Sequence, residues 1–358
     1  RPVAGRAVLL STAGVFLTAL LVGLFCHYLL HFKFLESMLI GAVISSTDAA
    51  SVFSILRSKR LNLKYNTASM LEVESGSNDP CSYMMTVIIL TVMSGKFSGG
   101  ELVWMIFAQL VFGICVGVLV ALGAAFILKK VQFATDGFDT IFVFCMALVA
   151  YVLASLLGGN GYLSTYIAGI ILGNQPLTNK KSLVHFFDGI TGLMQMLIFF
   201  LLGLLSFPSQ LPQILPYALA IAVFLTFVAR PVSVFAILSP FKAPIRQQLL
   251  VSWSGLRGAA SIVFAIMATV SPAYTKNDVF HIVIFIVLFS ISIQGSLLGL
   301  VAKKLDMIDD TGNVMKTFSD YSDEMPVEFI KIAIRKNHPW AGKKIMDILS
   351  PPDVLVVL

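Results

Sequence analysis

Apolar stretches of about 20 residues recur along most of this 358-residue chain. A helix of about 20 apolar residues is long enough to cross the roughly 30 Å hydrocarbon core of a bilayer. The chain is 57% hydrophobic and 12% charged, whereas a soluble domain has about 25% charged residues. The sequence therefore predicts an all-α polytopic membrane protein. Its expected membrane spans are 7–30, 35–56, 67–93, 101–128, 138–157, 161–174, 185–206, 213–238, 246–270 and 279–302.

Basic residues fall mainly on one side of the predicted membrane. If the loops alternate between the two sides, fourteen Lys and Arg residues lie on the first side and three on the other. The three are Lys33, Lys96 and Lys276. Because cytoplasmic loops carry the excess of Lys and Arg, we expect the first side and the C-terminus in the cytoplasm of a cell inner or plasma membrane. This topology accounts for the formal net charge of +6 without a nucleic-acid partner.

Two predicted spans are interrupted near their middle. Polar residues 45–48 interrupt the span 35–56, and residues 252–258 interrupt the span 246–270. Each is the middle span of a triplet, and the alternation gives the two triplets opposite orientations. Paired interrupted helices in opposed repeats are typical of secondary transporters, which bind substrate where the interrupted helices meet. We therefore expect an inverted-repeat transporter with two crossing, partly unwound helices.

Two aspartates lie near the predicted midplane of the membrane. Asp48 and Asp79 each lie about 12 residues into consecutive spans, or roughly 18 Å deep at about 1.5 Å per residue. A carboxylate at such depth usually belongs to an ion or proton pathway. Thr47 adds a hydroxyl, and Ser75 lies one turn before Asp79 on the same helix face. Such oxygen ligands suit an alkali cation, and burial favours the protonated acid, so cation and proton would compete for one carboxylate.

Glu74, Arg230 and Arg257 are further charged residues inside predicted spans. Glu74 and Arg230 lie at similar depths, roughly 10–12 Å from the cytoplasmic surface, and are expected to form a buried ion pair. That pairing leaves Asp48 and Asp79 without a counter-charge, although Asp48 as a structural helix cap is an alternative. Arg257 lies near the midplane, where we expect it mainly to satisfy backbone carbonyls of its broken helix.

Four short motifs carry a family resemblance over about residues 7–304. They are Thr47-Asp48, Glu74-Ser75-x-x-Asn78-Asp79, Ala229-Arg230-Pro231 and Gly255-Leu256-Arg257-Gly258. The chain resembles the monovalent cation:proton antiporter-1 family, which has the sodium/proton exchanger-like fold. This resemblance implies an ion site at Asp48 and Asp79, with Thr47 and Ser75 as co-ligands, and Asn78 as the mark of the electroneutral branch. It also implies a homodimer and about three further helices before Arg1.

The part of the chain after Lys304 has a different composition. Residues 305–325 are expected to be a polar linker, and residues 326–358 resemble the beginning of a cytosolic α/β regulatory module of the TrkA C-terminal type. Such a module implies regulation by a nucleotide or another small ligand. Together with Gly76-Ser77, the tail favours the bacterial potassium/proton antiporter subgroup. The four cysteines lie within predicted spans and form no CxxC pair, so we expect neither a disulfide framework nor a metal cofactor.

Two other functional classes are compatible with a polytopic membrane protein. A cation channel, or a potassium-uptake-type protein without exchange, would need a filter ring or a re-entrant carbonyl loop, and the sequence contains no such segment. An intramembrane protease would need its own paired-Asp motifs, or a nucleophilic Ser with a His in the membrane; Ser77 is not flanked in that way. We therefore predict no enzymatic activity, but electroneutral exchange of K+ or Na+ against protons by alternating access.

Overall fold

The computed structural model describes residues 3–59, 61–95, 98–131, 137–176, 180–207, 209, 211–271 and 277–309. The chain divides into two units, residues 1–322 and 323–358, and every described residue belongs to the first. The expected regulatory module at 326–358 lies outside the described residues and stays a prediction, as do the domain boundaries.

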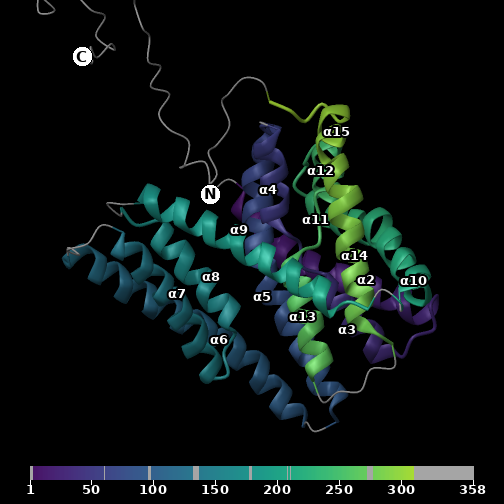
Figure 1. Cartoon of the computed structure of the whole chain (residues 1–358), viewed down its shortest axis with the longest axis horizontal. Coiled ribbons are helices and arrows are strands. Elements are labelled where there is room, and N and C mark those ends of the chain that lie inside the picture. Colours follow the sequence, from purple (N-terminus) through teal and green to yellow (C-terminus); the bar gives the residue numbers. More distant parts are fainter. Residues whose placement is uncertain are drawn as a thin grey trace, which may run out of the picture. The chain divides into compact units, whose positions relative to one another are not determined.

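Every predicted span corresponds to one helix or to a pair of helices, which confirms the all-α membrane fold (Figure 1). The first triplet consists of α1 (Ala4–Leu9) with α2 (Val15–Tyr28), α3 (Phe34–Ile44) with α4 (Ala49–Ser58), and α5 (Thr67–Met93). The middle helices are α6 (Gly99–Lys130), α7 (Phe138–Leu156), α8 (Gly161–Gly173) and α9 (Lys180–Leu205). The last triplet consists of α10 (Leu211–Phe224) with α11 (Arg230–Leu238), α12 (Ile245–Trp253) with α13 (Ala259–Val270), and α14 (Val279–Phe289) with α15 (Ser296–Lys304).

Six helical runs among the described residues are long and apolar enough to cross a membrane, judged by length and composition. They are Ala4–Tyr28, Gly99–Lys130, Phe138–Leu156, Ser182–Leu205, Pro212–Leu238 and Val279–Lys304. The spans 35–56 and 246–270 fall short because each is broken into two shorter helices. Helix α5 runs unbroken through its polar segment 74–79 and contains Pro80.

The helices pack around three hydrophobic cores. The largest lies among α2, α3, α10, α13 and α14, a second among α1, α4, α5, α11, α12 and α15, and a small one among α6, α7 and α8. In Figure 1 helices α6, α7 and α8 lie to one side, in blue to teal. The α2–α3 contact is especially close, because a Cβ at Gly41 would collide with the carbonyl of Ala19. Small residues at such positions let membrane helices approach each other backbone to backbone.

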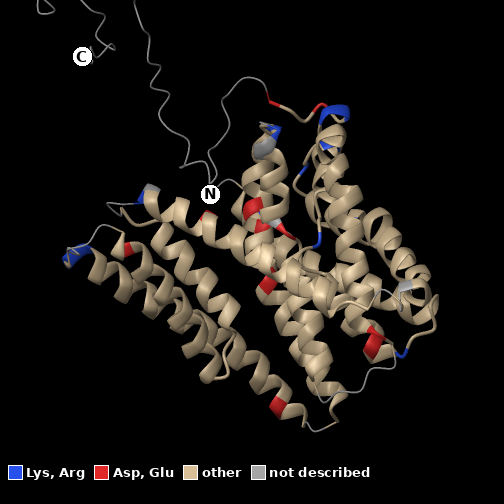
Figure 2. Cartoon of the chain, viewed as in Figure 1, with Lys and Arg blue, Asp and Glu red and all other residues tan. Residues whose placement is uncertain are grey.

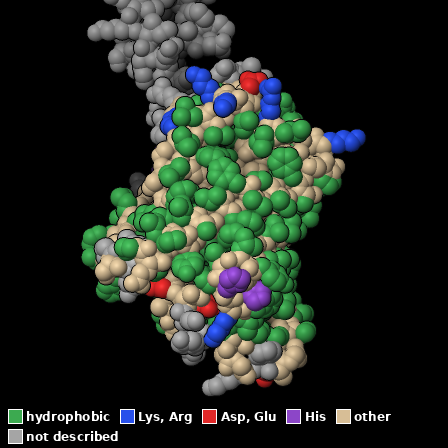
Figure 3. All heavy atoms as spheres, turned by 90° about the vertical axis from the view of Figure 1, so that its right-hand side faces the viewer, with side chains coloured by type: hydrophobic (Ala, Val, Ile, Leu, Met, Phe, Trp, Pro, Cys, Tyr) green, Lys and Arg blue, Asp and Glu red, His purple; other side chains and the backbone are tan. Residues whose placement is uncertain are grey.

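The surface and the charges fit a membrane-embedded protein. Figure 3 shows one face covered mainly by hydrophobic side chains, with Lys and Arg toward its edges. Figure 2 shows Lys and Arg at the ends of α4, α6, α9 and α15. Two basic residues depart from this pattern: Arg230 and Arg257 are 2% and 1% exposed, respectively, within the helix bundle.

The segment after α15 folds back onto the loop before α5. Leu63 and Ile308 form an isolated antiparallel β-bridge. The amide of Lys64 donates to the carbonyl of Met307, and the amide of Asp309 donates to the carbonyl of Asn62, both at 2.9 Å. Asp306 forms ion pairs with Lys64 and Arg246, each at 3.0 Å. We call residues 305–309 the return segment.

Candidate ion-binding site

The two unwound segments meet at the centre of the bundle. Residues 45–48 separate α3 from α4, and residues 254–258 separate α12 from α13. The amide of Asp48 donates a 2.8 Å hydrogen bond to the carbonyl of Leu256, which joins the two segments. Gly258 lies so close to the Asp48 carboxylate that a Cβ there would collide with it. The expected crossing of two partly unwound helices is therefore confirmed.

The Arg257 guanidinium secures this crossing. Its Nη1 donates to the carbonyls of Ser45 and Ser46 at 2.6 and 2.7 Å. Its backbone amide donates to Ser290 Oγ at 3.1 Å. These two carbonyls belong to the α3–α4 break, whereas we expected Arg257 to satisfy those of its own broken helix. A buried backbone carbonyl needs a partner when it has left a helix, and here the partner comes from the opposite repeat.

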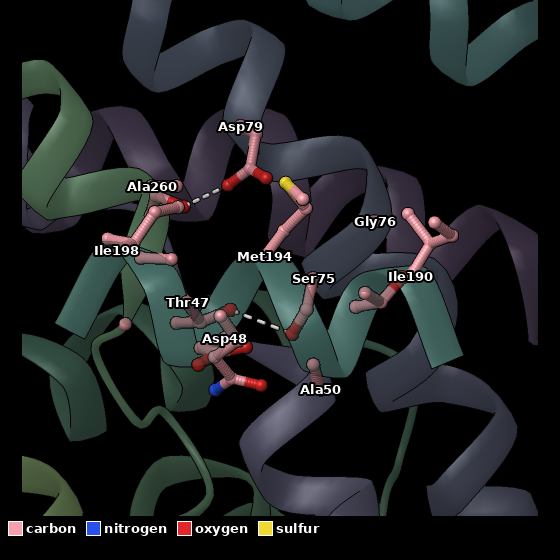
Figure 4. A pocket seen from close by; sticks show the side chains of 15 residues that line it. Thr47, Asp48, Ala50, Ser75, Gly76, Asp79, Ile190, Met194, Ile198 and Ala260 are labelled. Carbon is pink, nitrogen blue, oxygen red and sulfur yellow. Dashed lines mark hydrogen bonds between the residues drawn. The ribbon is translucent and has the colours of Figure 1, made fainter. Parts of the chain in front are cut away.

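A cavity of about 410 Å³ opens beside the crossing and contains both aspartates in its wall. Figure 4 shows α9, in teal, running across the cavity, with Ile190 and Met194 among the side chains that line it. Asp48 and Asp79 come from the α3–α4 break and from α5, so one cavity brings together two carboxylates from consecutive spans. Thr47 and Ser75 also line it.

Hydroxyl and amide groups connect α5 to the unwound segment. The Ser46 hydroxyl donates to an Asp79 carboxylate oxygen, and it lies 3.2 Å from Asn78 Oδ1. Asn78 Nδ2 donates to Thr47 Oγ1 at 2.5 Å. The hydroxyls of Thr47 and Ser75 are 2.9 Å apart (Figure 4). Because α5 is regular here, its i, i+4 pair Ser75 and Asp79 presents both oxygen groups on one face.

Asp48 is held at the start of α4. The Ser51 amide donates to Asp48 Oδ1 at 3.3 Å, and the Ser51 hydroxyl donates to Oδ2 at 2.6 Å. This is the geometry of a helix N-cap, so the capping alternative describes part of what Asp48 does. Capping and facing the cavity are compatible, because Asp48 also lines the cavity. Among the described residues, the recorded ion pairs join neither Asp48 nor Asp79 to a Lys or Arg.

The structure places Glu74 and Arg230 in a buried ion pair. Arg230 Nη2 lies 2.5 Å from Glu74 Oε1, and the side chains are 2% and 0% exposed. A π-helical turn, Leu225–Ala229, directly precedes Arg230. The Arg230 side chain also lies against Gly255, where a Cβ would be 2.7 Å from its Nε. The ion pair therefore connects α5 to α11 and supports the second unwound segment.

Three residues near the aspartates were not singled out from the sequence. Ser46 binds Asp79, Ser51 binds Asp48, and Gln195 of α9 donates to Ser51 Oγ at 3.1 Å. Ser46 lies within the polar interruption, so its position was the available signal. Gln195 is a polar residue within the apolar run 193–205, which is the pattern that should have drawn attention to it.

Two antiporters of known name are similar to this chain in sequence. The chain is 34% identical over 350 residues to the K(+)/H(+) antiporter NhaP of Alkalimonas amylolytica, covering 96% of this chain and 61% of that protein. It is 35% identical over 304 residues to the K(+)/H(+) antiporter NhaP2 of Shewanella baltica (strain OS223), covering 83% and 52%. The chain thus spans between half and two thirds of these relatives' length.

A solved structure and a family model agree with these relatives. The structure of the sodium proton antiporter MjNhaP1 from Methanocaldococcus jannaschii at pH 8 matches with a TM-score of 0.72 and 25% identity, covering 84% of this chain and 79% of that chain. The family model described as sodium/hydrogen exchanger, transmembrane, matches residues 1–304. The match includes both unwound segments and the cavity between them. The chain belongs to the transmembrane sodium/hydrogen exchanger family.

Proposed function

We propose that the protein exchanges a monovalent cation for a proton across the cell membrane, and that Asp48 and Asp79 bind the ions. The observation that carries this proposal is that both carboxylates line one cavity at the helix crossing, while the recorded ion pairs of the described residues leave both without a basic partner. A buried carboxylate lacking a fixed counter-charge is stabilised either by a proton or by a bound cation. The two ions therefore compete for it.

The neighbouring groups have separate roles in this proposal. Thr47 and Ser75 supply hydroxyl oxygens beside the carboxylates, and oxygen ligands suit hard cations. Asn78 orients Thr47 through its amide. The ion pair between Glu74 and Arg230 is structural, since neither charge needs an ion from the cavity.

The charges predict the stoichiometry. Asn78, a neutral side chain, precedes Asp79, and the carboxylate of Glu74 is already paired with Arg230. One carboxylate, Asp79, then alternates between a proton and a cation. Exchange of one monovalent cation for one proton moves no net charge, so transport is electroneutral.

The cation, the orientation in the membrane and the partners are proposed from the relatives and from the predicted topology. Two relatives carry the name K(+)/H(+) antiporter, which supports K+ as a substrate, with Na+ as the second candidate. The Lys and Arg distribution supports a cytoplasmic C-terminus. A homodimer, contact with membrane lipid, and regulation of the C-terminal part by a nucleotide or small ligand complete the proposal.

Exchange can be tested in sealed proteoliposomes containing a pH-sensitive dye. Addition of K+, Na+ or Li+ should move protons outward only when the protein is present, and the exchange should proceed when an ionophore clamps the membrane potential. Labelled cation should also undergo counterflow, which requires alternating access. A cation channel would instead give a conductance without counterflow. Cation conductance without coupled proton movement would refute the proposal.

A further inference from the structure

Helix α9 forms one wall of the cavity but is weakly embedded in the molecule. Only 6% of the residues in its apolar stretch are buried, against 50% for the run Pro212–Leu238. Its recorded helix–helix packing is with α13 and α7. Thr191 and Gln195 are its polar side chains in the cavity wall. A hydrogen bond from either one can therefore contribute noticeably to where α9 lies relative to the crossing.

Gln195 makes such a bond, and it leads directly to Asp48. Gln195 Nε2 donates to Ser51 Oγ at 3.1 Å, and Ser51 Oγ donates to Asp48 Oδ2 at 2.6 Å. A serine hydroxyl has a single proton, which is committed to the carboxylate here. Ser51 can therefore only accept from Gln195, so the amide nitrogen must face it. The chain of donors runs from α9 through α4 to the carboxylate.

Donors arranged in this order strengthen one another. An amide N–H bound to the hydroxyl oxygen polarises its O–H and makes it a better donor to the carboxylate. The result is an Asp48 carboxylate held in one orientation beside the cavity. The same chain of hydrogen bonds makes the position of α9 sensitive to any change at Asp48.

We propose that Gln195 is a positioning residue for ion exchange, which acts through Ser51 to hold the Asp48 carboxylate toward the cavity and to link it to α9. This inference rests on the proposed function and adds to it a residue outside the two repeats. Loss of the Gln195 bond would leave the Asp48 carboxylate less firmly oriented toward the cavity and so weaken cation binding, without removing a group that binds the ion.

The test compares five variants in proteoliposomes, using exchange rates over a series of cation concentrations. Gln195→Met keeps the length and flexibility of the side chain but removes the donor. Ser51→Ala breaks the chain of hydrogen bonds at its centre, and the double variant completes a cycle. Met196→Leu is the matched control, because it changes the neighbouring side chain of α9, which is 67% exposed and is not among the residues that line the cavity. Thermal stability of each variant is measured in parallel.

Gln195→Met should raise the apparent KM for the cation about fivefold, the fold-change that a typical net hydrogen bond corresponds to, with the maximal rate within about twofold. Met196→Leu should change KM by less than about twofold. In the Ser51→Ala background, Gln195→Met should have no further effect, while Ser51→Thr, which keeps the hydroxyl, should retain wild-type KM.

Three outcomes would overturn the inference. These are an unchanged KM in Gln195→Met, additive effects of the two changes, or a fall in maximal rate that matches a loss of thermal stability. The first two would occur in a protein that still exchanges ions, so they leave the proposed function intact. Absence of exchange in the wild type would refute the proposed function, and the inference with it.

Discussion

The backbone amide of Asp48 donates a hydrogen bond to the carbonyl of Leu256, 2.8 Å away, so that the two interrupted helices share a main-chain contact. An unwound segment inside a bundle loses its own helical hydrogen bonds, and each unpaired group would be costly in an apolar environment. Here each segment supplies partners for the other, because Arg257 also binds the carbonyls of Ser45 and Ser46. The crossing thus depends on groups from both breaks.

Asp79→Asn and Asp48→Asn should each abolish exchange while leaving expression and monodispersity unchanged. Both carboxylates line the cavity. An amide in place of Asp79 cannot alternate between a proton and a cation, and an amide in place of Asp48 removes a carboxylate ligand of the cation. Rates in dye-loaded proteoliposomes provide the measurement. Retention of half the wild-type rate would remove the substituted residue from the ion site.

Glu74→Gln and Arg230→Ala should each lower stability as well as transport. Removing one member of a buried ion pair leaves the other charge unpaired, at a cost of about 3–5 kcal/mol. Because these side chains are 0% and 2% exposed, the stranded charge gains little from solvent. A thermal-shift cycle should show that the double variant recovers part of the loss. Strictly additive losses would mean that the two residues do not act as partners.

Gly258→Ala and Gly41→Ala should have different consequences, although both positions are tightly packed. A Cβ at Gly258 would collide with the Asp48 carboxylate, so transport should fall more than stability. A Cβ at Gly41 would collide with the carbonyl of Ala19 in the α2–α3 contact, and Gly41 is not among the residues that line the cavity, so folding should suffer first. The two variants are distinguished by comparing the loss of exchange rate with the loss of thermal stability in each. Gly123→Ala serves as the control, because a Cβ there meets nothing within 4 Å.

Transport should produce no sustained current, and its apparent cation affinity should weaken as the pH falls. The first expectation follows from one-for-one exchange, and the second from protons occupying the same carboxylate as the cation. Solid-supported-membrane electrophysiology, run beside a dye assay on the same proteoliposomes, tests both. A current that scales with the dye-reported flux would require an unequal stoichiometry.

Asp306→Asn should loosen the return segment. The hydrogen bond and charge of Lys64, with Arg246 beside it, lower the pKa of the Asp306 carboxyl. A lowered folded-state pKa means that the ion pairs stabilise the fold above the unfolded pKa of about 3.9, and that this contribution is lost as the pH falls through the folded value. At neutral pH the variant should therefore exchange the amide hydrogens of Lys64 and Asp309 faster.

Hydrogen–deuterium exchange of peptides covering residues 61–66 and 305–309 measures this change. Lys303→Gln is the control, since it removes an exposed charge at the end of α15. Unaltered exchange in Asp306→Asn would show that the backbone hydrogen bonds hold the return segment without the ion pairs.

Much of the fold could be predicted because membrane spans are recognisable in the sequence as long apolar runs. Both helix breaks were also predictable, because Ser45–Asp48 and the Gly255–Gly258 segment place polar or glycine residues where lipid-facing helix would be apolar. Because a helix advances at a fixed rise per residue, the depth of each residue in the membrane could be calculated, and Glu74 and Arg230 were predicted to lie at similar depths.

What could not be predicted depends on rotation about helix axes and on contacts between distant helices. Nothing in the sequence around Arg257 reveals that its guanidinium reaches the carbonyls of the opposite break rather than its own. The role of Gln195 likewise depends on which face α9 turns to the cavity, and periodicity is uninformative in a helix that is apolar nearly all round. The return segment was missed because it begins the stretch 305–325, whose polar composition as a whole resembles that of a linker, although Leu305, Met307 and Ile308 are apolar.

The return segment also decides where the membrane unit can be cut. Helix α15 ends at Lys304, and the apolar pattern of the sequence ends there too. Yet Met307 is fully buried, and Leu63, its neighbour in the same hydrophobic cluster, is 1% exposed. A protein shortened to residue 304 would lose the bridge partner of Leu63 and leave an apolar surface open at the entry to α5. A protein shortened to residue 309 would keep these contacts, and with them the packing at the start of α5, the helix that carries Asp79.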